Sequence, residues 1–219
     1  SIPLDNKSRI EVLKGTSGML AGIGSPGGMV NFVVKRPTDA PLREGFVSWQ
    51  QDGSVLVSTD LSDRFGEQRQ FGLRLNAAYE HIDPQTYVAD GYRYLLALAG
   101  DWRLNADTVL EAEIENSRRS QPSVPGFSVL GSRVPEPGNP RINLNNQPWS
   151  QPSQFNATTG SLRWRQRLDP QWSLLAQAAT QQLETDDNLA FPYGCSAEGF
   201  YDRYCSDGTY DLYDFRSDN

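Results

Sequence analysis

The sequence predicts a mainly β protein built from antiparallel strands, and three observations lead to this prediction. Apolar and polar residues alternate with a period of two in seven runs of the 219-residue chain. The connections between these runs alternate between short turns and long loops. Finally, no run of about 18 apolar residues occurs, which excludes a transmembrane helix but leaves open strands that cross a membrane.

The first 37 residues have a different residue pattern from the rest of the chain. Two short β-rich runs, 10–13 and 30–34, flank a segment with many glycines. Glycine lets a chain turn tightly and lets its backbone approach a ligand or another wall. A polar linker, 38–42, then leads into the alternating runs. The glycines of the segment are Gly15, Gly18, Gly22, Gly24, Gly27 and Gly28.

The clearest alternating run is 70–80, in which Phe71, Leu73 and Leu75 are separated by mostly polar residues. Such a strand has one apolar and one largely polar face. The other strands are expected at 44–51, 54–63, 91–103, 108–118, 155–168 and 171–184.

The connections between these strands favour a membrane barrel. Short turns on one rim and long loops on the other are typical of outer-membrane barrels, in which the short turns are periplasmic. Residues 52–53 are the exception, a short turn on the long-loop side. The tight turns are 66–68, 105–107 and 169–171, and the long links are 83–90, 121–154 and 185–209.

Side-chain chemistry separates a barrel from a soluble β-sandwich. Trp102, Trp164 and Trp172 lie near the short turns, where they would form an aromatic girdle, although a sandwich core could also hold them. Of two neighbouring strands, one carries acidic residues on its polar face and the other carries basic residues. Such faces suit the water-filled lumen of a barrel, where opposite charges can lie next to each other. These residues are Glu111, Glu113, Glu115, Arg163, Arg165 and Arg167.

Composition limits the partners and the compartment. The formal net charge of -7 argues against a nucleic-acid partner. Residues 1–5 have no features of an export signal, so such a signal has been removed or lies outside this sequence. The only two cysteines, Cys195 and Cys205, have a spacing that suits a local disulfide in an oxidising compartment. A metal site would need more ligands than these two and His81 supply.

No motif indicates an enzyme. The segment 22–27 matches the glycine pattern of a dinucleotide site, but a strand-like run and Pro37 follow it where the required helix should start. No Gly-Lys-Ser/Thr follows the glycines, and nothing pairs the scattered carboxylates as a catalytic acid and base. His81 is the sole histidine and sits at a strand end, which is more typical of a rim residue than of a general base. We expect no catalytic residue.

Three blocks at fixed spacing carry a family resemblance: Arg-Ile-Glu-Val-Leu-Lys-Gly at 9–15, Gly-Ser-Pro-Gly-Gly at 24–28, and Asn31 followed by Lys-Arg-Pro at 35–37. They resemble the plug domain of TonB-dependent outer-membrane receptors of the ferric-siderophore branch. The resemblance implies the C-terminal part of a plug at 1–37, a linker at 38–42, and at 43–219 seven strands entering an eighth, near 210–219, of a 22-stranded transmembrane β-barrel. Because the family's TonB box, first plug half and terminal strand are missing, we expect a part of a larger receptor.

The resemblance also implies a function. A ferric siderophore would bind on the outer side, and the TonB–ExbB–ExbD complex would pull the plug to open a path across the outer membrane. Iron would arrive only as the chelate, so neither a cofactor nor a resident metal is expected. The alternatives are a receptor for another nutrient such as haem, a passive or adhesive outer-membrane barrel, and a secreted β-sandwich binding module.

Site residues follow from the resemblance at matching positions. Many members have Tyr where this chain has Ala21 and Pro where it has Thr16, so chelate contacts should shift from the plug apex toward loop aromatics. The implied ligand contacts are Met19, Ala21, Gly22, Gly24, Phe127, Trp149, Tyr193 and Tyr201. A second set should pin the plug to lumenal carboxylates, namely Arg9, Glu11, Lys14, Lys35 and Arg36.

We predict a disulfide between Cys195 and Cys205, which lie in a loop of the kind that related receptors close with a disulfide after the seventh strand. The geometry of the bond gives the test, because a separation of the two Cα atoms well beyond about 7 Å would rule it out.

Overall fold

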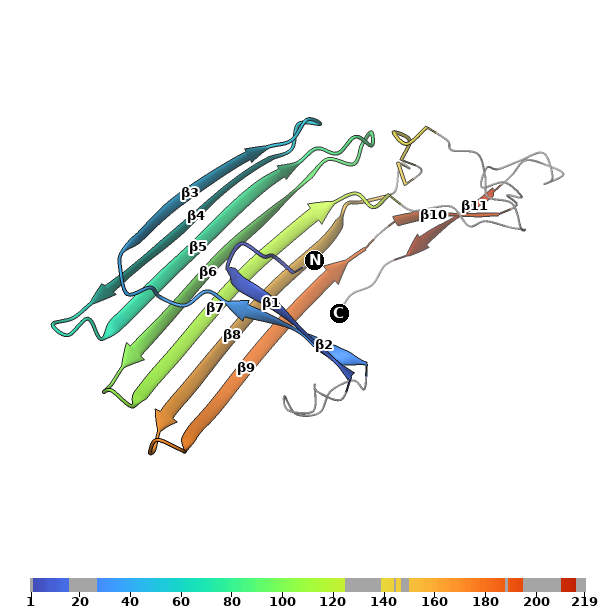
Figure 1. The fold of residues 1–219 in the computed structure, drawn as a ribbon. Helices are drawn as coiled ribbons and strands as arrows, with labels where there is room; N and C mark the ends of the chain where they lie inside the picture. The colour runs from blue at the N-terminus through green and yellow to red at the C-terminus, as the bar shows by residue number, and fades with distance from the viewer. Residues whose placement is uncertain are drawn as a thin grey trace.

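The computed structural model describes residues 2–15, 27–124, 139–143, 145–146 and 150–187, and the backbone of 189–194 and 210–215. These residues form a curved seven-stranded antiparallel sheet, a hairpin that lies across one face of it, and a second small hairpin (Figure 1). Among them, no helix is long and apolar enough to span a bilayer.

The seven predicted strands are all present, and each pairs with the next along the chain. The ends of each strand fall within three residues of the predicted ones, because the turn residues and the period-two runs leave little freedom in where pairing starts. The strands are β3 (Leu42–Trp49), β4 (Val55–Phe65), β5 (Phe71–Ile82), β6 (Gly91–Arg103), β7 (Thr108–Gln121), β8 (Ser153–Arg167) and β9 (Ser173–Asp186).

The two β-rich runs of the N-terminal part form the first hairpin. Strand β1 (Lys7–Lys14) pairs antiparallel with β2 (Gly28–Val34), and Lys14 lies opposite Gly28. Gly28 has a φ of 117°, and a Cβ there would lie 2.2 Å from the carbonyl oxygen of Leu13. Glycine is therefore required where the connection between the strands enters β2.

The C-terminal strand differs in its partner from the expected eighth barrel strand. Strand β11 (Tyr210–Phe215) lies in the predicted segment, but it pairs with β10 (Leu189–Gly194) and not with β9. Strand β10 falls within the link expected at 185–209. Pairing two segments that are near in sequence closes a shorter loop, which costs less chain entropy than a distant pairing.

The register confirms the predicted division of side chains between two faces. Phe71, Trp102, Leu110 and Trp164 follow one another across β5 to β8, so they share a face. Apolar residues of the alternating runs lie on that face: Phe71, Leu73, Leu75, Tyr94, Leu96, Leu98, Leu110, Ile114, Leu162, Trp164 and Leu174. Polar residues of the same runs lie on the other: Arg74, Asn76, Glu111, Glu113, Arg163 and Arg165.

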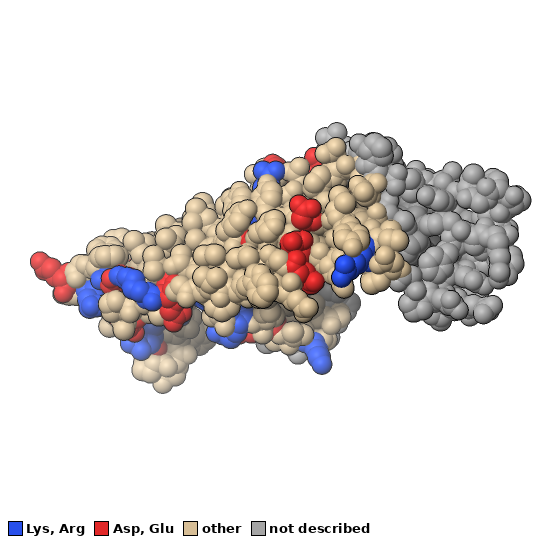
Figure 2. Space-filling view, turned by 90° about the horizontal axis from the view of Figure 1, so that it is seen from above, with Lys and Arg blue, Asp and Glu red and all other residues tan. Residues whose placement is uncertain are grey.

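The apolar side chains of the outer face form a band that crosses the strands obliquely. Toward the long loops, Tyr79 pairs with Tyr94, but Tyr94 pairs on its other side with Arg118 of β7. The band therefore reaches further toward the long loops on β5 and β6 than on β7. An oblique band becomes parallel to a membrane if the strands are tilted, as they are in barrels. In the view of Figure 2, much of the surface carries no charge, and charged side chains gather at the end away from the grey residues and again near the grey residues.

The outer face gives a stability prediction. Leu98 is 43% exposed and lies in mid-strand on β6, between the rings of Trp102 and Tyr94. When the protein is inserted in lipid, Leu98→Arg should lower the free energy of unfolding by roughly 2–4 kcal/mol, because it places a cation in hydrocarbon. Denaturant unfolding in lipid vesicles measures the change. Ser48→Arg on the inner face of β3 is the control and should cost much less; equal costs would contradict the assignment of the faces.

Candidate functional site

The candidate site is the interface between the inner face of the sheet and the segment formed by residues 2–15 and 27–39. The inner face is polar where this segment covers it, since Asp60, Arg64, Asn76 and Glu111 are each less than a tenth exposed. Buried charges are tolerated when they are paired and hydrogen-bonded. The contacts fall into three clusters, which follow the chain from residue 5 to residue 39.

The first cluster holds the residues that precede and begin the hairpin. Arg93 of β6 donates a hydrogen bond from Nη1 to Asp5 Oδ2 at 2.7 Å and pairs with Glu80. Asn6, which is 1% exposed, donates from Nδ2 to Glu115 Oε2 at 2.7 Å, and Lys7 forms an ion pair with the same carboxylate. Strands β6 and β7 of the sheet thus hold residues 5–7. These residues are not among the anchors that the sequence predicts.

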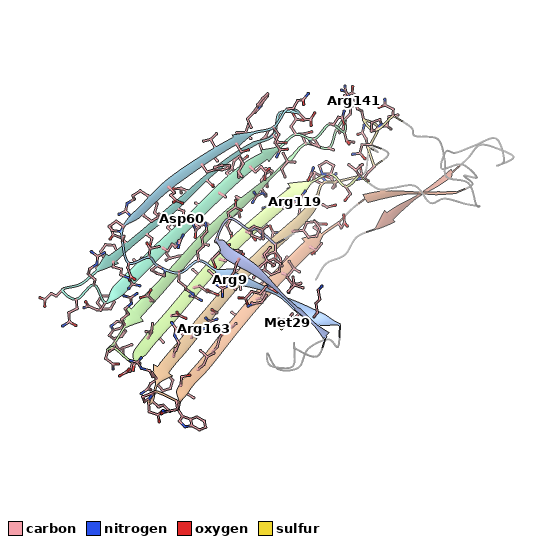
Figure 3. The ribbon with its side chains drawn as sticks, in the orientation of Figure 1. Arg9, Met29, Asp60, Arg119, Arg141 and Arg163 are labelled. Carbon is pink, nitrogen blue, oxygen red and sulfur yellow. The ribbon has the colours of Figure 1, made fainter. Side chains whose placement is uncertain are left out.

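The second cluster centres on Asp60 of β4, labelled in Figure 3. Arg74 binds both oxygens of Asp60, with Nε 2.8 Å from Oδ1 and Nη2 2.7 Å from Oδ2. Lys35 Nζ lies 2.9 Å from Asp60 Oδ2. Arg74 also donates from Nη1 to the carbonyl oxygen of Arg36 at 2.9 Å, and Arg36 Nη2 lies 2.7 Å from Glu113 Oε2. Lys35 and Arg36, both predicted to pin the plug, therefore contact wall carboxylates.

The third cluster fastens the linker to the wall. Arg64, whose side chain is 2% exposed, binds Asp101 through two hydrogen bonds of 2.8 Å each. Asp39 of the linker lies 3.1 Å from Arg64 Nε and accepts a hydrogen bond from Arg103 Nη2 at 2.8 Å. The hydrogen bond from Arg103 and its charge, with a smaller contribution from Arg64, hold the pKa of the Asp39 carboxyl below its usual value.

The linker approaches the wall so closely that only glycine fits beneath it. A Cβ on Gly72 would lie 2.7 Å from Pro37 Cβ and 2.9 Å from Asp101 Oδ2. Next to this contact, the backbone nitrogen of Thr38 donates to Ser62 Oγ at 2.9 Å. Linker and sheet are therefore in direct contact, with no room for a side chain between them.

The remaining predicted anchors behave differently from Lys35 and Arg36. Arg9 Nε donates to Glu11 Oε1 at 2.7 Å, and Asn31 Nδ2 donates to Glu11 Oε2 at 2.9 Å, so these residues join β1 to β2 instead of joining the hairpin to the wall. The hydrogen bond from Arg9, followed by that from Asn31, holds the pKa of Glu11 below its usual value. For Lys14 we find no ion pair within the described part of the chain.

Two cavities flank the hairpin. One of about 800 Å³ lies between residues 2–7 and the inner face of β6 to β9. The other, of about 570 Å³, lies nearer the short turns, and Arg9 and Glu11 face Glu111 and Arg163 across it. There Glu111 accepts hydrogen bonds from Arg165 Nη2 at 3.0 Å and from Arg163 Nη1 at 3.5 Å. The predicted pairing of opposite charges on β7 and β8 is confirmed for Glu111, whereas Glu113 and Glu115 pair with Arg36 and Lys7 of the covering segment.

The predicted ligand contacts lie beyond what the structure describes. Of Tyr193 only the backbone, in β10, is described. Both cysteines of the predicted disulfide, Cys195 and Cys205, are also outside the described residues, as are Met19, Ala21, Gly22, Gly24, Phe127, Trp149 and Tyr201. In the described part, no group of three or more His, Cys, Asp or Glu residues could hold a metal ion.

Comparison with known proteins shows which proteins the chain resembles. No family model matches it. It is 34% identical over 199 residues to the metal-pseudopaline receptor CntO of Pseudomonas aeruginosa, covering 88% of this chain and 27% of that protein. The ferrichrome receptor FcuA of Yersinia enterocolitica is 26% identical over 197 residues, covering 84% and 25%. The chain thus spans about a quarter of the length of these relatives.

A solved structure has the same fold. The ferric-catecholate import receptor Fiu of E. coli K12, in its closed form, superposes with a TM-score of 0.79 at 16% identity. The match covers 98% of this chain and 32% of that structure. At this identity the likeness concerns the fold.

The close approach of the linker gives a prediction with a matched control. Gly72→Ala should push Pro37 away from the sheet and cost about 1–3 kcal/mol, as overpacking does. Hydrogen exchange should show it, because the Thr38 amide would lose its bond to Ser62 and exchange faster. Gly100→Ala on the neighbouring strand meets its nearest atom at an ordinary 3.4 Å and should leave that amide protected. Equal protection of Thr38 in both variants would show that the linker is not held here.

Proposed function

This chain belongs to the family of TonB-dependent outer-membrane receptors, and we propose that it serves in the energised uptake of a ferric siderophore. In this proposal, residues 1–37 belong to the plug, 38–42 are the linker, and 43–219 contribute wall strands of the barrel. The relatives named above are transport receptors and not enzymes.

One observation supports a movable plug above the others: the hairpin is held by polar contacts and not by an apolar core. The described buried apolar cluster is small, with Ala78, Leu95, Ala97 and the partly buried Leu56, all on the wall strands. Segment 2–39, by contrast, meets the wall through ion pairs and hydrogen bonds beside two cavities. Such groups can exchange protein partners for water, which makes the net cost of separation modest.

The proposed mechanism needs only a change in these contacts. A chelate bound on the outer side would favour one plug position to the extent that it binds that position more tightly. TonB, energised by ExbB and ExbD, would supply the pull. The clusters at Asp5–Lys7 and Lys35–Arg36 would then separate from the wall, while no bond in the substrate is broken.

The site assignment remains part of the proposal. The glycine-rich connection between β1 and β2 would present Met19, Ala21, Gly22 and Gly24 to the chelate, and Phe127, Trp149, Tyr193 and Tyr201 would approach it from the loops. Glu11 would keep the two hairpin strands together during movement, since it accepts a hydrogen bond from Asn31 of β2 in addition to the one from Arg9 of its own strand.

A second candidate substrate has support from a relative. The name of the Pseudomonas protein refers to a metal chelate without specifying iron. A chelate of another metal is therefore the alternative cargo, and the binding panel should contain both kinds.

Binding and uptake of radiolabelled chelates by iron-starved cells that express a full-length receptor containing this chain test the proposal. Gly24→Trp should block uptake, because the indole would fill the approach that glycine leaves open. Trp149→Ala and Tyr193→Ala should each weaken binding by about 1 kcal/mol, as loss of an aromatic contact does. Glu11→Gln is the contrasting variant: affinity should stay near the reference value while the transport rate changes.

Unchanged affinity and uptake in Gly24→Trp and both aromatic variants would show that the site is elsewhere. Growth of a receptor deletion strain on every chelate, at the rate of the parent strain, would refute uptake as the function.

A further inference from the structure

The two long connections at the outer end of the sheet are docked on each other. Residues 139–143 and 145–146, in the returning part of the connection between β7 and β8, lie against residues 83–90, which connect β5 and β6. The backbone nitrogen of Tyr87 donates to the carbonyl oxygen of Arg141 at 2.8 Å. Asn143 Nδ2 donates to the carbonyl oxygen of Val88 at 3.1 Å.

Side-chain packing reinforces this backbone contact. The guanidinium carbon of Arg141 lies 5.8 Å from the centre of the Tyr87 ring, within the range of a cation–π interaction. Arg141 Nη1 also donates to the Tyr87 hydroxyl at 3.2 Å. A planar guanidinium satisfies both contacts at once, which an ammonium group cannot do.

Three residues at this contact are buried, which is unusual for surface connections. Asn143 is 8% and Asn145 2% exposed, and Ala89 is fully buried. The Asn143 carboxamide oxygen accepts a hydrogen bond from the Asn145 backbone nitrogen at 2.9 Å, and Gln121 Nε2 donates to the Ala89 carbonyl oxygen at 2.9 Å. Asparagine side chains are mostly exposed in proteins. Here both the carboxamide nitrogen and the carboxamide oxygen of Asn143 form hydrogen bonds.

The backbone of residue 88 gives an independent sign of the docking. Val88 has a φ of 54°, a conformation that is rare for a β-branched residue. Such a backbone persists only where its surroundings over-determine it. The bond from Asn143 to the Val88 carbonyl is one of these constraints.

We propose that Arg141 and Asn143 are positioning residues for chelate binding, which hold residues 139–143 against residues 83–90 so that these parts of the two outer connections present one surface. The inference rests on the proposed function. Neither residue has to touch the chelate. Segments that are already held against each other do not have to be brought together on binding, so the docked receptor binds without that entropic cost.

The test uses the full-length receptor with Arg141→Lys and Asn143→Asp. Arg141→Lys keeps the charge but loses the planar contact, and Asn143→Asp keeps the oxygen that accepts from Asn145 but loses the donor to Val88. Gln85→Ala, at an exposed residue of the facing connection 83–90, is the control. Hydrogen exchange at the Tyr87 amide reports docking. Saturation and stopped-flow binding of a labelled ferric hydroxamate, ferric catecholate and ferric carboxylate report the affinity and the rates.

In both variants we expect faster exchange at Tyr87 and an affinity lower by about two- to tenfold for the probe that the unaltered receptor binds. The association rate should fall by that factor with the dissociation rate unchanged, because fewer receptors are in the competent state. A general folding defect would instead lower the number of sites.

Two results would overturn the positioning role: faster exchange with unchanged affinity, or unchanged exchange in both variants. If the unaltered receptor binds none of the three probes, the proposed function fails and this inference fails with it. That result is distinguishable, because reference and variants then behave alike.

Discussion

The structure depends on the pairing of charges between the inner face of the sheet and the segment that lies on it. Asp60 shows the principle most clearly, because it binds Arg74 of the wall and Lys35 of the segment together. If Asp60 bound Arg74 alone, the two would form an ordinary ion pair within the sheet. If it bound Lys35 alone, Arg74 would remain in the sheet without a partner charge. Each cluster along residues 5–39 repeats this arrangement, in which a wall ion pair is completed by a group from the covering segment.

This arrangement explains why one sheet can have two incompatible environments. Period-two alternation sends apolar side chains to one face, where they are exposed for lipid, and charged side chains to the other. Buried ion pairs add little net stability, but loss of one partner is costly because it leaves a buried charge unmatched. The segment on the inner face is therefore held in a specific position without the apolar burial that would make it immovable.

The sequence predicted the parts that depend on local pattern. The seven strands, both faces of the sheet and the facing charges of Glu111 and Arg163 follow from alternation and turn chemistry. Alternation and turn chemistry could not predict the partner of β11, since pairing depends on which of the two available strands, β9 or β10, is nearer in the folded chain. The pairs of Asp5 with Arg93 and of Asp39 with Arg64 were also hidden, because residues more than twenty positions apart meet only through the path of the linker. Arg9 and Glu11 were assigned to the wall, but hairpin pairing places Asn31 opposite Glu11, and Arg9 lies two residues before Glu11 on the same strand, so Glu11 bonds within the hairpin.

The central claim is that one face of the sheet meets lipid while the other is covered by the hairpin segment and its ion pairs. Spin labels placed singly from Tyr92 to Trp102 along β6 of the full-length receptor in lipid vesicles test it directly, through their collisions with oxygen and with a water-soluble nickel chelate. Even-numbered positions should show high oxygen access and low nickel access, and odd-numbered positions from 93 to 99 should be shielded from oxygen. A profile without period-two alternation, or with strong oxygen access at the odd-numbered positions, would contradict the account.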